Sequence, residues 1–147
     1  MPYKYNDETT ALKESNGNAC FVDYSEKEIA AFRWVFPVIT DSKNFIPLAK
    51  DPINVSVRKK CGGWALSFHE TEEASVEAWE YLTEDKPNKF KKLGTHIAFG
   101  KVLKSDGKCS DSDEYLHFNF IEYKGKDLSK SFEIIRKLAT DEMIKSL

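Results

Sequence analysis

The 147-residue sequence lacks any run approaching the roughly 20 apolar residues of a membrane span, and its start, MPYKYNDETT, lacks the apolar stretch of a secretory signal. It also lacks a strong charge of either sign, because the net charge is only -2. Bulk charge of this size does not indicate a nucleic-acid or membrane partner. We therefore expect a cytoplasmic protein that binds neither nucleic acid nor membrane.

Cysteine is scarce and widely spaced, with Cys20, Cys61 and Cys109 forming an odd set without a CxxC pair. This spacing indicates neither a disulfide framework nor a cysteine zinc site, and we expect reduced thiols. Glycine-rich phosphate loops are also absent, which argues against a P-loop protein. The GxSxG motif is absent too, which argues against a serine hydrolase with a nucleophile elbow.

The composition, 41% hydrophobic and 31% charged, is typical of one ordinary globular domain at this length. We expect residues 1–19, which are polar, to form a peripheral N-terminal arm, and residues 20–147 to form a single globular α+β domain. In the first half of the chain, residue patterns predict a helix over 26–31 capped by Ser25, a strand over 32–36 and an irregular crossing over 37–60 with a short strand at 53–57. They then predict a strand over 64–68, a helix from Thr71 and a short helix ending before Gly94. The rest of the chain is predicted to form paired strands over 95–103 and 115–123, joined as a hairpin by a polar loop, then a helix over 128–138 and a final helical turn at 140–142. This order favours an α+β fold with a mostly antiparallel sheet of about four or five strands covered by helices.

Reactive side chains concentrate where the strand over 64–68 runs into the following helix. Ser67, His69 and Glu70 lie at this corner, a common place for ligand contacts. We expect these three to converge with Arg33, His117 and Glu122 on one ligand pocket, because strands distant in sequence often bring polar groups together in this way. The apolar stripe of Val76, Trp79 and Leu82 on the helix and the alternating strand over 115–123 predict a shared core that includes Trp64 and Ile135.

Two other chemistries can be weighed from residue type. His69, His96 and His117 could hold a zinc ion, or could each be hydrogen-bonded and inert, since no local metal motif joins them. Cys61 follows Arg58-Lys59-Lys60, where cations favour a thiolate, but a structural cysteine before a glycine turn is the commoner situation.

Three short segments of the sequence resemble, in part, the arrangement of site residues in a known family. Phe32-Arg33-Trp34 on an early strand, Ala65-Leu66-Ser67-Phe68 on a strand before a helix, and the late-strand Glu122 resemble the Arg-Ser-Glu layout of ADP-ribosyltransferases. The resemblance implies that NAD is the cofactor, that Arg33 and Ser67 hold it, and that Glu122 is catalytic and contacts the nicotinamide ribose. Phe120 stands two residues before Glu122, where the family commonly has Glu or Gln.

The competing interpretation is a binding domain without chemistry. Aromatic residues make up 13% of the chain and include three tryptophans, and some of them can form a patch for a partner. The crossing over 37–60 could present such a surface. We therefore expect a small intracellular binding or regulatory domain that acts through a protein partner or a small nucleotide-like ligand, with an ADP-ribosyltransferase-like enzyme as the alternative.

Overall fold

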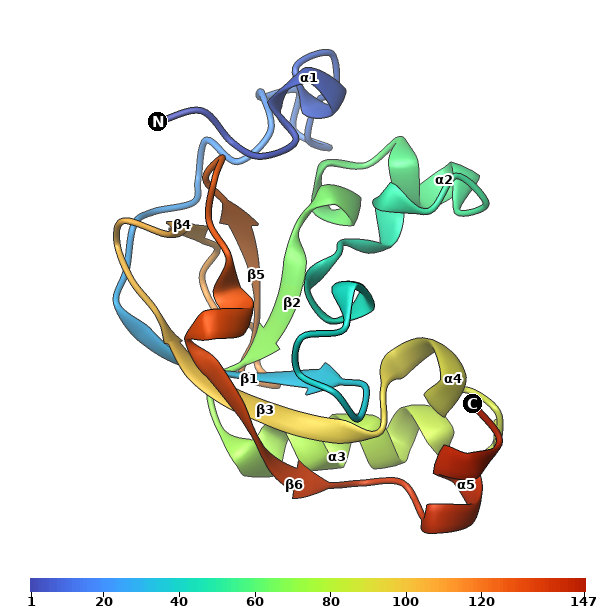
Figure 1. The fold of residues 1–147 in the computed structure, drawn as a ribbon. Helices are drawn as coiled ribbons and strands as arrows, with labels where there is room; N and C mark the ends of the chain where they lie inside the picture. Colours follow the sequence, from blue (N-terminus) through green and yellow to red (C-terminus); the bar gives the residue numbers. More distant parts are fainter.

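One antiparallel sheet, with strand order β4-β5-β2-β1-β3-β6, organises the chain in the computed structural model, which describes residues 1–147 (Figure 1). The strands are β1 (Ile29–Val35), β2 (Leu66–His69), β3 (His96–Val102), β4 (Gly107–Cys109), β5 (His117–Glu122) and β6 (Phe132–Lys137). The helices are α1 (Asn6–Thr9), α2 (Val55–Arg58), α3 (Glu72–Thr83), α4 (Phe90–Leu93) and α5 (Asp141–Lys145), and the 3-10 turns are η1 (Ser42–Phe45), η2 (Leu48–Lys50), η3 (Cys61–Trp64) and η4 (Leu128–Lys130). The α+β class is confirmed, but the sheet has six strands rather than four or five. No helix combines the length and apolarity that crossing a membrane requires.

The strand pairing defines two sheet faces. On the first, which we call the Phe68 face, alternate residues of β2 and β5 pack with Ala31 and Val35 of β1 and with Phe132 of β6 into the largest buried cluster. On the second, the His69 face, α3 packs against β1 and β2, and the Trp34 Nε1 donates to the Ser75 carbonyl at 3.0 Å. Side chains one residue apart on a strand therefore enter different environments.

Long-range pairing differs from the predicted hairpin between the strands over 95–103 and 115–123. β3 pairs with β1 and β6, whereas β5 pairs with β2 and β4. The loop predicted between those strands contains β4, because Cys109 is buried and pairs through its backbone with both β5 and Ser25. The register between β3 and β6 shifts between Ile97 and Ala98.

Two predicted helices are strands or extended chain. The backbone N–H and carbonyl of Ser25 exchange hydrogen bonds with Cys109 at 2.9 and 2.7 Å, so Ser25 joins the sheet edge and does not cap a helix over 26–31. The helix predicted over 128–138 is instead η4 followed by β6. Ile134 and Ile135 are β-branched and favour a strand, in which Ile134 packs on the core while Ile135 is 40% exposed.

The helix after β2 is confirmed together with its start. The Thr71 hydroxyl accepts from the Ala74 N–H at 3.1 Å, as an N-cap does. The short helix before Gly94 is also confirmed as α4, and Gly94 ends it at φ 125°. A Cβ at Gly94 would lie 2.9 Å from the Val35 carbonyl oxygen, so this position requires glycine in both conformation and space. The final helical turn is confirmed as part of α5.

The crossing between β1 and β2 is irregular, as predicted, but residues 53–57 contribute to α2 and form no strand. A disulfide joins Cys20 to Cys61 at the end of this crossing, so the expectation of reduced thiols is wrong for these two residues. Cys109 is the free cysteine and is buried. Burial raises the pKa of its thiol to about 11, which keeps it protonated.

The predicted single core is divided into three clusters. Trp64 packs with Tyr5, Phe21 and Ile121 on the His69 face, and Trp79 packs with Phe90 and Ala139 beneath α3. The N-terminal segment takes part in the first of these, because Tyr5 is buried and the Lys4 N–H donates to the Glu122 carbonyl at 2.9 Å.

Candidate functional site

Arg33 lies on β1 with its side chain on the Phe68 face. Its Nε donates to the Asn44 carbonyl at 2.7 Å and its Nη1 to the Ser67 carbonyl at 3.0 Å. The guanidinium carbon lies 5.8 and 5.7 Å from the ring centroids of Phe45 and Phe68. Burial lowers the pKa of Arg33 to about 10, while the charge of Glu122 opposes this shift. The Arg33 guanidinium therefore links the crossing, through Asn44, to β2, through Ser67.

Glu122 ends β5 on the same face and is 3% exposed. One carboxylate oxygen lies 3.6 Å from the Lys4 Nζ, and the other, Oε1, has no hydrogen-bond partner. Burial raises the pKa of Glu122 to about 6, and the nearby charge of Lys4 limits this rise. A buried carboxylate with one unsatisfied oxygen is costly in its charged form.

His69 and His117 are directly paired across β2 and β5 on the His69 face. Their ring centroids are 5.5 Å apart, and the His69 ring is equally far from the Trp34 ring. The His117 Nδ1 lies 3.8 Å from a carboxylate oxygen of Asp113. Burial lowers the pKa of His69 to about 4 and also lowers the pKa of His117, although Asp113 opposes both shifts. Both rings are therefore neutral near pH 7.

Ser67 and Glu70 complete the predicted corner. The Ser67 side chain is exposed and pairs across the sheet with Asn119 on the His69 face. Glu70 follows β2 and is half-buried, and its N–H donates to the Leu116 carbonyl at 2.9 Å. The structure therefore brings Arg33 and Glu122 to one face of the sheet, and Ser67, His69 and His117 to the other.

Two kinds of site that the sequence left open, a three-histidine zinc site and a nucleophilic cysteine, are not formed in the structure. His96 is paired with Val35 and lies on the Phe68 face, away from the other two histidines, and no group of three or more His, Cys, Asp or Glu side chains could hold a metal ion. The three-histidine zinc hypothesis is therefore wrong. A nucleophilic Cys61 is also wrong in this structure, because its sulfur is bonded to Cys20.

Sequence reasoning did not single out the most exposed apolar group of the crossing. Leu48, Ile53 and Val55 are 64%, 79% and 59% exposed, within eight residues of one another. They belong to what we call the 48–64 lobe, formed by η2, α2 and η3, which contact one another. The sequence signal was weak, because single apolar residues among prolines and charges show no periodicity.

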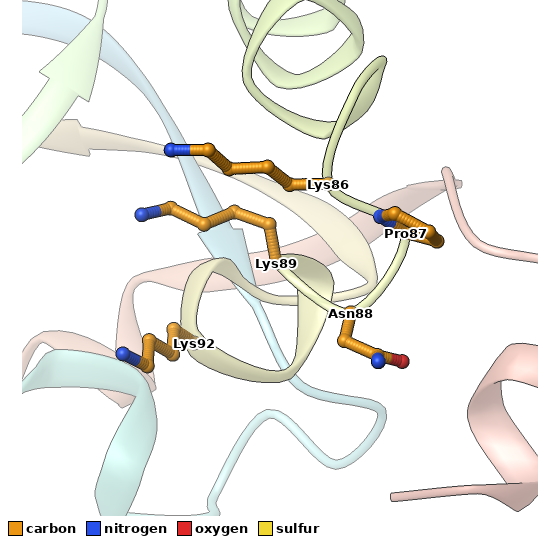
Figure 2. A pocket seen from close by; sticks show the side chains of 5 residues that line it. All are labelled: Lys86, Pro87, Asn88, Lys89 and Lys92. Carbon is orange, nitrogen blue, oxygen red and sulfur yellow. The ribbon is translucent and has the colours of Figure 1, made fainter.

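A second feature is a hollow of about 440 Å³ beside α4 and the segment that joins α3 to it, lined by Lys86, Pro87, Asn88, Lys89 and Lys92 (Figure 2). The sequence contains a basic cluster of Lys89, Lys91 and Lys92, which is typical of a solvated face, and it does not mark Lys86 as part of that cluster. The spacing of three residues between Lys86, Lys89 and Lys92 was the available signal.

Together these features define a disulfide-containing α+β domain with a six-stranded antiparallel sheet and a lobe that exposes three apolar side chains. The chain matches no protein-family model, no curated protein and no solved structure.

Proposed function

We propose that this chain is a protein-binding domain whose contact surface is the 48–64 lobe. The observation that carries the proposal is the exposure of Leu48, Ile53 and Val55 on one short, ordered segment. Single exposed apolar side chains are common on protein surfaces, whereas an exposed apolar group gathered in one place is typical of interaction sites.

The lobe supports binding because its backbone is fixed before a partner arrives. The Asn54 Nδ2 donates to the Leu48 carbonyl at 2.8 Å, and the Arg58 Nη1 donates to the Ala49 carbonyl at 2.7 Å. The guanidinium carbon of Arg58 also lies 5.2 Å from the centroid of the Trp64 ring, and the Trp64 Nε1 donates a hydrogen bond to the Arg58 carbonyl at 3.1 Å. A preorganised surface loses less conformational entropy when it binds.

The charges around the lobe indicate what kind of partner fits. Lys50, Lys59 and Lys60 are exposed around the apolar residues, and Asp51 is the one exposed carboxylate in the segment from 48 to 60. Complementary potentials favour association and suppress wrong partners. The partner is therefore a protein segment that combines apolar and acidic residues.

The disulfide bears on where such binding takes place. Disulfides persist in oxidising environments and are rare in a reducing cytosol. The Cys20–Cys61 bond therefore supports a proposal that the domain works in an oxidising compartment. The cytoplasmic location expected from the sequence stays a prediction, which this bond disfavours.

The test is selection of peptides from a random library against the intact domain, followed by calorimetry and amide chemical-shift mapping. We expect apolar-acidic peptides to be enriched and to shift the amides of the 48–64 lobe. The triple variant Leu48→Ser, Ile53→Ser and Val55→Ser should lose this binding. Equal binding of the selected peptides by this variant would refute the proposal.

A matched control changes exposed apolar residues elsewhere, with Val22→Ser, Leu103→Ser and Leu147→Ser, which are 55%, 41% and 51% exposed. We expect it to keep the peptide affinity. Surface substitutions of this type usually change stability by about 0.5 kcal/mol or less each, so both variants should fold.

The second candidate is the NAD-dependent transfer implied by the ADP-ribosyltransferase resemblance. The observation in its favour is that Arg33 and Glu122 share the Phe68 face. For this function Arg33 would have to release the carbonyls of Asn44 and Ser67, and the Ser67 hydroxyl would have to act from the opposite face.

Calorimetric titration with NAD tests the second candidate. Binding that is lost in Arg33→Ala but kept in Glu122→Gln would support a transferase-like pocket. Absence of heat with the wild-type domain, at concentrations that detect millimolar affinity, would refute it. A thermal melt of Arg33→Ala separates lost binding from lost folding.

A further inference from the structure

The hollow beside α4 combines three lysines with no opposing charge. Lys86, Lys89 and Lys92 line it together with Pro87 and Asn88, and neither an aromatic side chain nor a carboxylate is among the lining residues. In Figure 2 the three lysine side chains extend toward the same side of the segment, while Pro87 and Asn88 point away from them. The hollow is thus a positively charged surface open to solvent.

The backbone explains why the three side chains form a column. The Lys89 N–H donates to the Lys86 carbonyl at 2.9 Å, and the Lys92 N–H donates to the Lys89 carbonyl at 3.0 Å. In a turn and a short helix with hydrogen bonds of this i to i+3 type, residues three apart lie on the same side of the segment. The lysine spacing and the turn geometry therefore match.

The segment is held firmly from the inside. Phe90 is 2% exposed and packs with Trp79, whose Nε1 donates to the Gly94 carbonyl at 3.0 Å. Gly94 in turn donates its N–H to the Phe90 carbonyl at 2.8 Å. The buried aromatic pair fixes the backbone from which the lysines project.

No carboxylate neutralises the column. The six ion pairs of the structure use other basic residues, namely Lys4, Lys27, Lys43, His117, Arg136 and Lys137. Glu84 and Asp85 precede the column along the chain, but neither forms an ion pair with it. Three neighbouring like charges repel one another, and an anionic ligand relieves that repulsion.

We propose that Lys86, Lys89 and Lys92 form a binding site for a sulfated polysaccharide. Lysine ammonium groups act as point charges toward sulfate and phosphate esters, and a column of three engages successive groups along one linear chain. This site is separate from the proposed protein-binding lobe and does not depend on it.

The surroundings of the lysines select this polyanion over others. No aromatic side chain lines the hollow, so bases of single-stranded nucleic acid have nothing to stack on. Pro87 is the one apolar side chain in the lining, and it points away from the lysines, so no large apolar side chain beside them inserts into a lipid surface. The disulfide is typical of secreted and cell-surface proteins, which meet sulfated glycans.

The experiment measures binding of a heparin-derived octasaccharide to the intact domain by calorimetry at several salt concentrations. We expect the affinity to fall on the order of tenfold or more between 50 and 200 mM salt, as for about three released counterions. The variant Lys86→Gln, Lys89→Gln and Lys92→Gln should lose at least about tenfold in affinity at the lower salt.

The matched control removes the same charge elsewhere, with Lys104→Gln, Lys124→Gln and Lys145→Gln, three exposed lysines that form no ion pair. It should keep the affinity within about twofold if the column binds, whereas an equal loss in both variants would show general charge attraction and overturn the proposal. Unchanged binding in the column variant would also overturn it. Tighter binding of inorganic polyphosphate, single-stranded DNA or anionic phosphatidylglycerol vesicles at equal charge would assign the column to that ligand and overturn the choice of a sulfated polysaccharide.

Discussion

Replacing Glu122 by glutamine should stabilise the domain at neutral pH and leave it unchanged in acid. Glu122 is 3% exposed, one of its oxygens has no hydrogen-bond partner, and burial raises its pKa from 4.5 to about 6. A difference of about 1.5 in pKa corresponds to about 2 kcal/mol at about 1.4 kcal/mol for each pKa unit. Glutamine has the same shape and avoids the buried charge.

The pH dependence follows from the direction of the shift. The folded state binds the Glu122 proton more tightly than the unfolded state, so the stability that this proton contributes is fully present below about pH 4.5. It is lost as pH rises through about 6. We therefore expect Glu122→Gln to match the wild type at pH 4 and to exceed its free energy of unfolding by about 2 kcal/mol at pH 7.5.

The assay is urea unfolding followed by tryptophan fluorescence at pH 4, 5, 6, 7 and 8. Glu133→Gln, which removes an exposed carboxylate from β6, is the matched control and should show little change at any pH. Lys4→Gln removes the 3.6 Å ion pair with Glu122. This change should raise the pKa of Glu122 further, so that the loss of stability caused by its ionisation occurs at higher pH. A Glu122→Gln variant less stable than the wild type at pH 7.5, or a difference that is constant from pH 4 to 8, would refute this reasoning.

Three further predictions concern the scaffold. Reducing the Cys20–Cys61 bond, which spans 41 residues, should lower the free energy of unfolding by about 4 kcal/mol in a denaturant melt, on the chain-entropy model; a loss below about 1 kcal/mol would contradict it. Trp79→Ala removes a buried ring and its hydrogen bond to Gly94, and should cost about 3 to 5 kcal/mol, whereas a loss under about 1 kcal/mol would mean that the ring is solvated. Thr71→Ala removes the N-cap of α3 and should cost about 1 kcal/mol, with Thr71→Asp keeping most of the stability and an unchanged melt counting against the cap.

The parts of the fold that depend on neighbouring residues were predictable. α3 was foreseen from Thr71 and the acidic residues that follow it, because capping is decided within one turn of chain. The pattern of Phe132, Ile135 and Leu138 fits a helical stripe and so predicts a helix where β6 lies, whereas in the strand Phe132 and Ile134 pack on the core and Ile135 is exposed. Short apolar segments of this kind fit both the period of a helix, about 3.6 residues, and that of a strand, about 2 residues.

The parts that depend on long-range pairing were not predictable. No local signal states that β5 pairs with β2 while β3 pairs with β1, and the spacing of Cys20 and Cys61 does not indicate a bond between them. For the same reason, the residues predicted to form one pocket lie on two opposite faces of the sheet. These residues lie on strands or directly after one, as predicted, but the face that each occupies follows from the register, in which a shift of one residue exchanges the two faces.

The two edge strands of the sheet are poor templates for strand addition by a second copy of the chain. At one edge Ser25 already occupies the outer backbone groups of Cys109, and at the other β6 exposes Glu133, Arg136 and Lys137 beside the register shift at Ile97. Short, covered, charged or irregular edges are the usual ways in which proteins prevent strand addition by another molecule. The protein should therefore resist fibril-like association at high concentration, even though its core is largely β-structure.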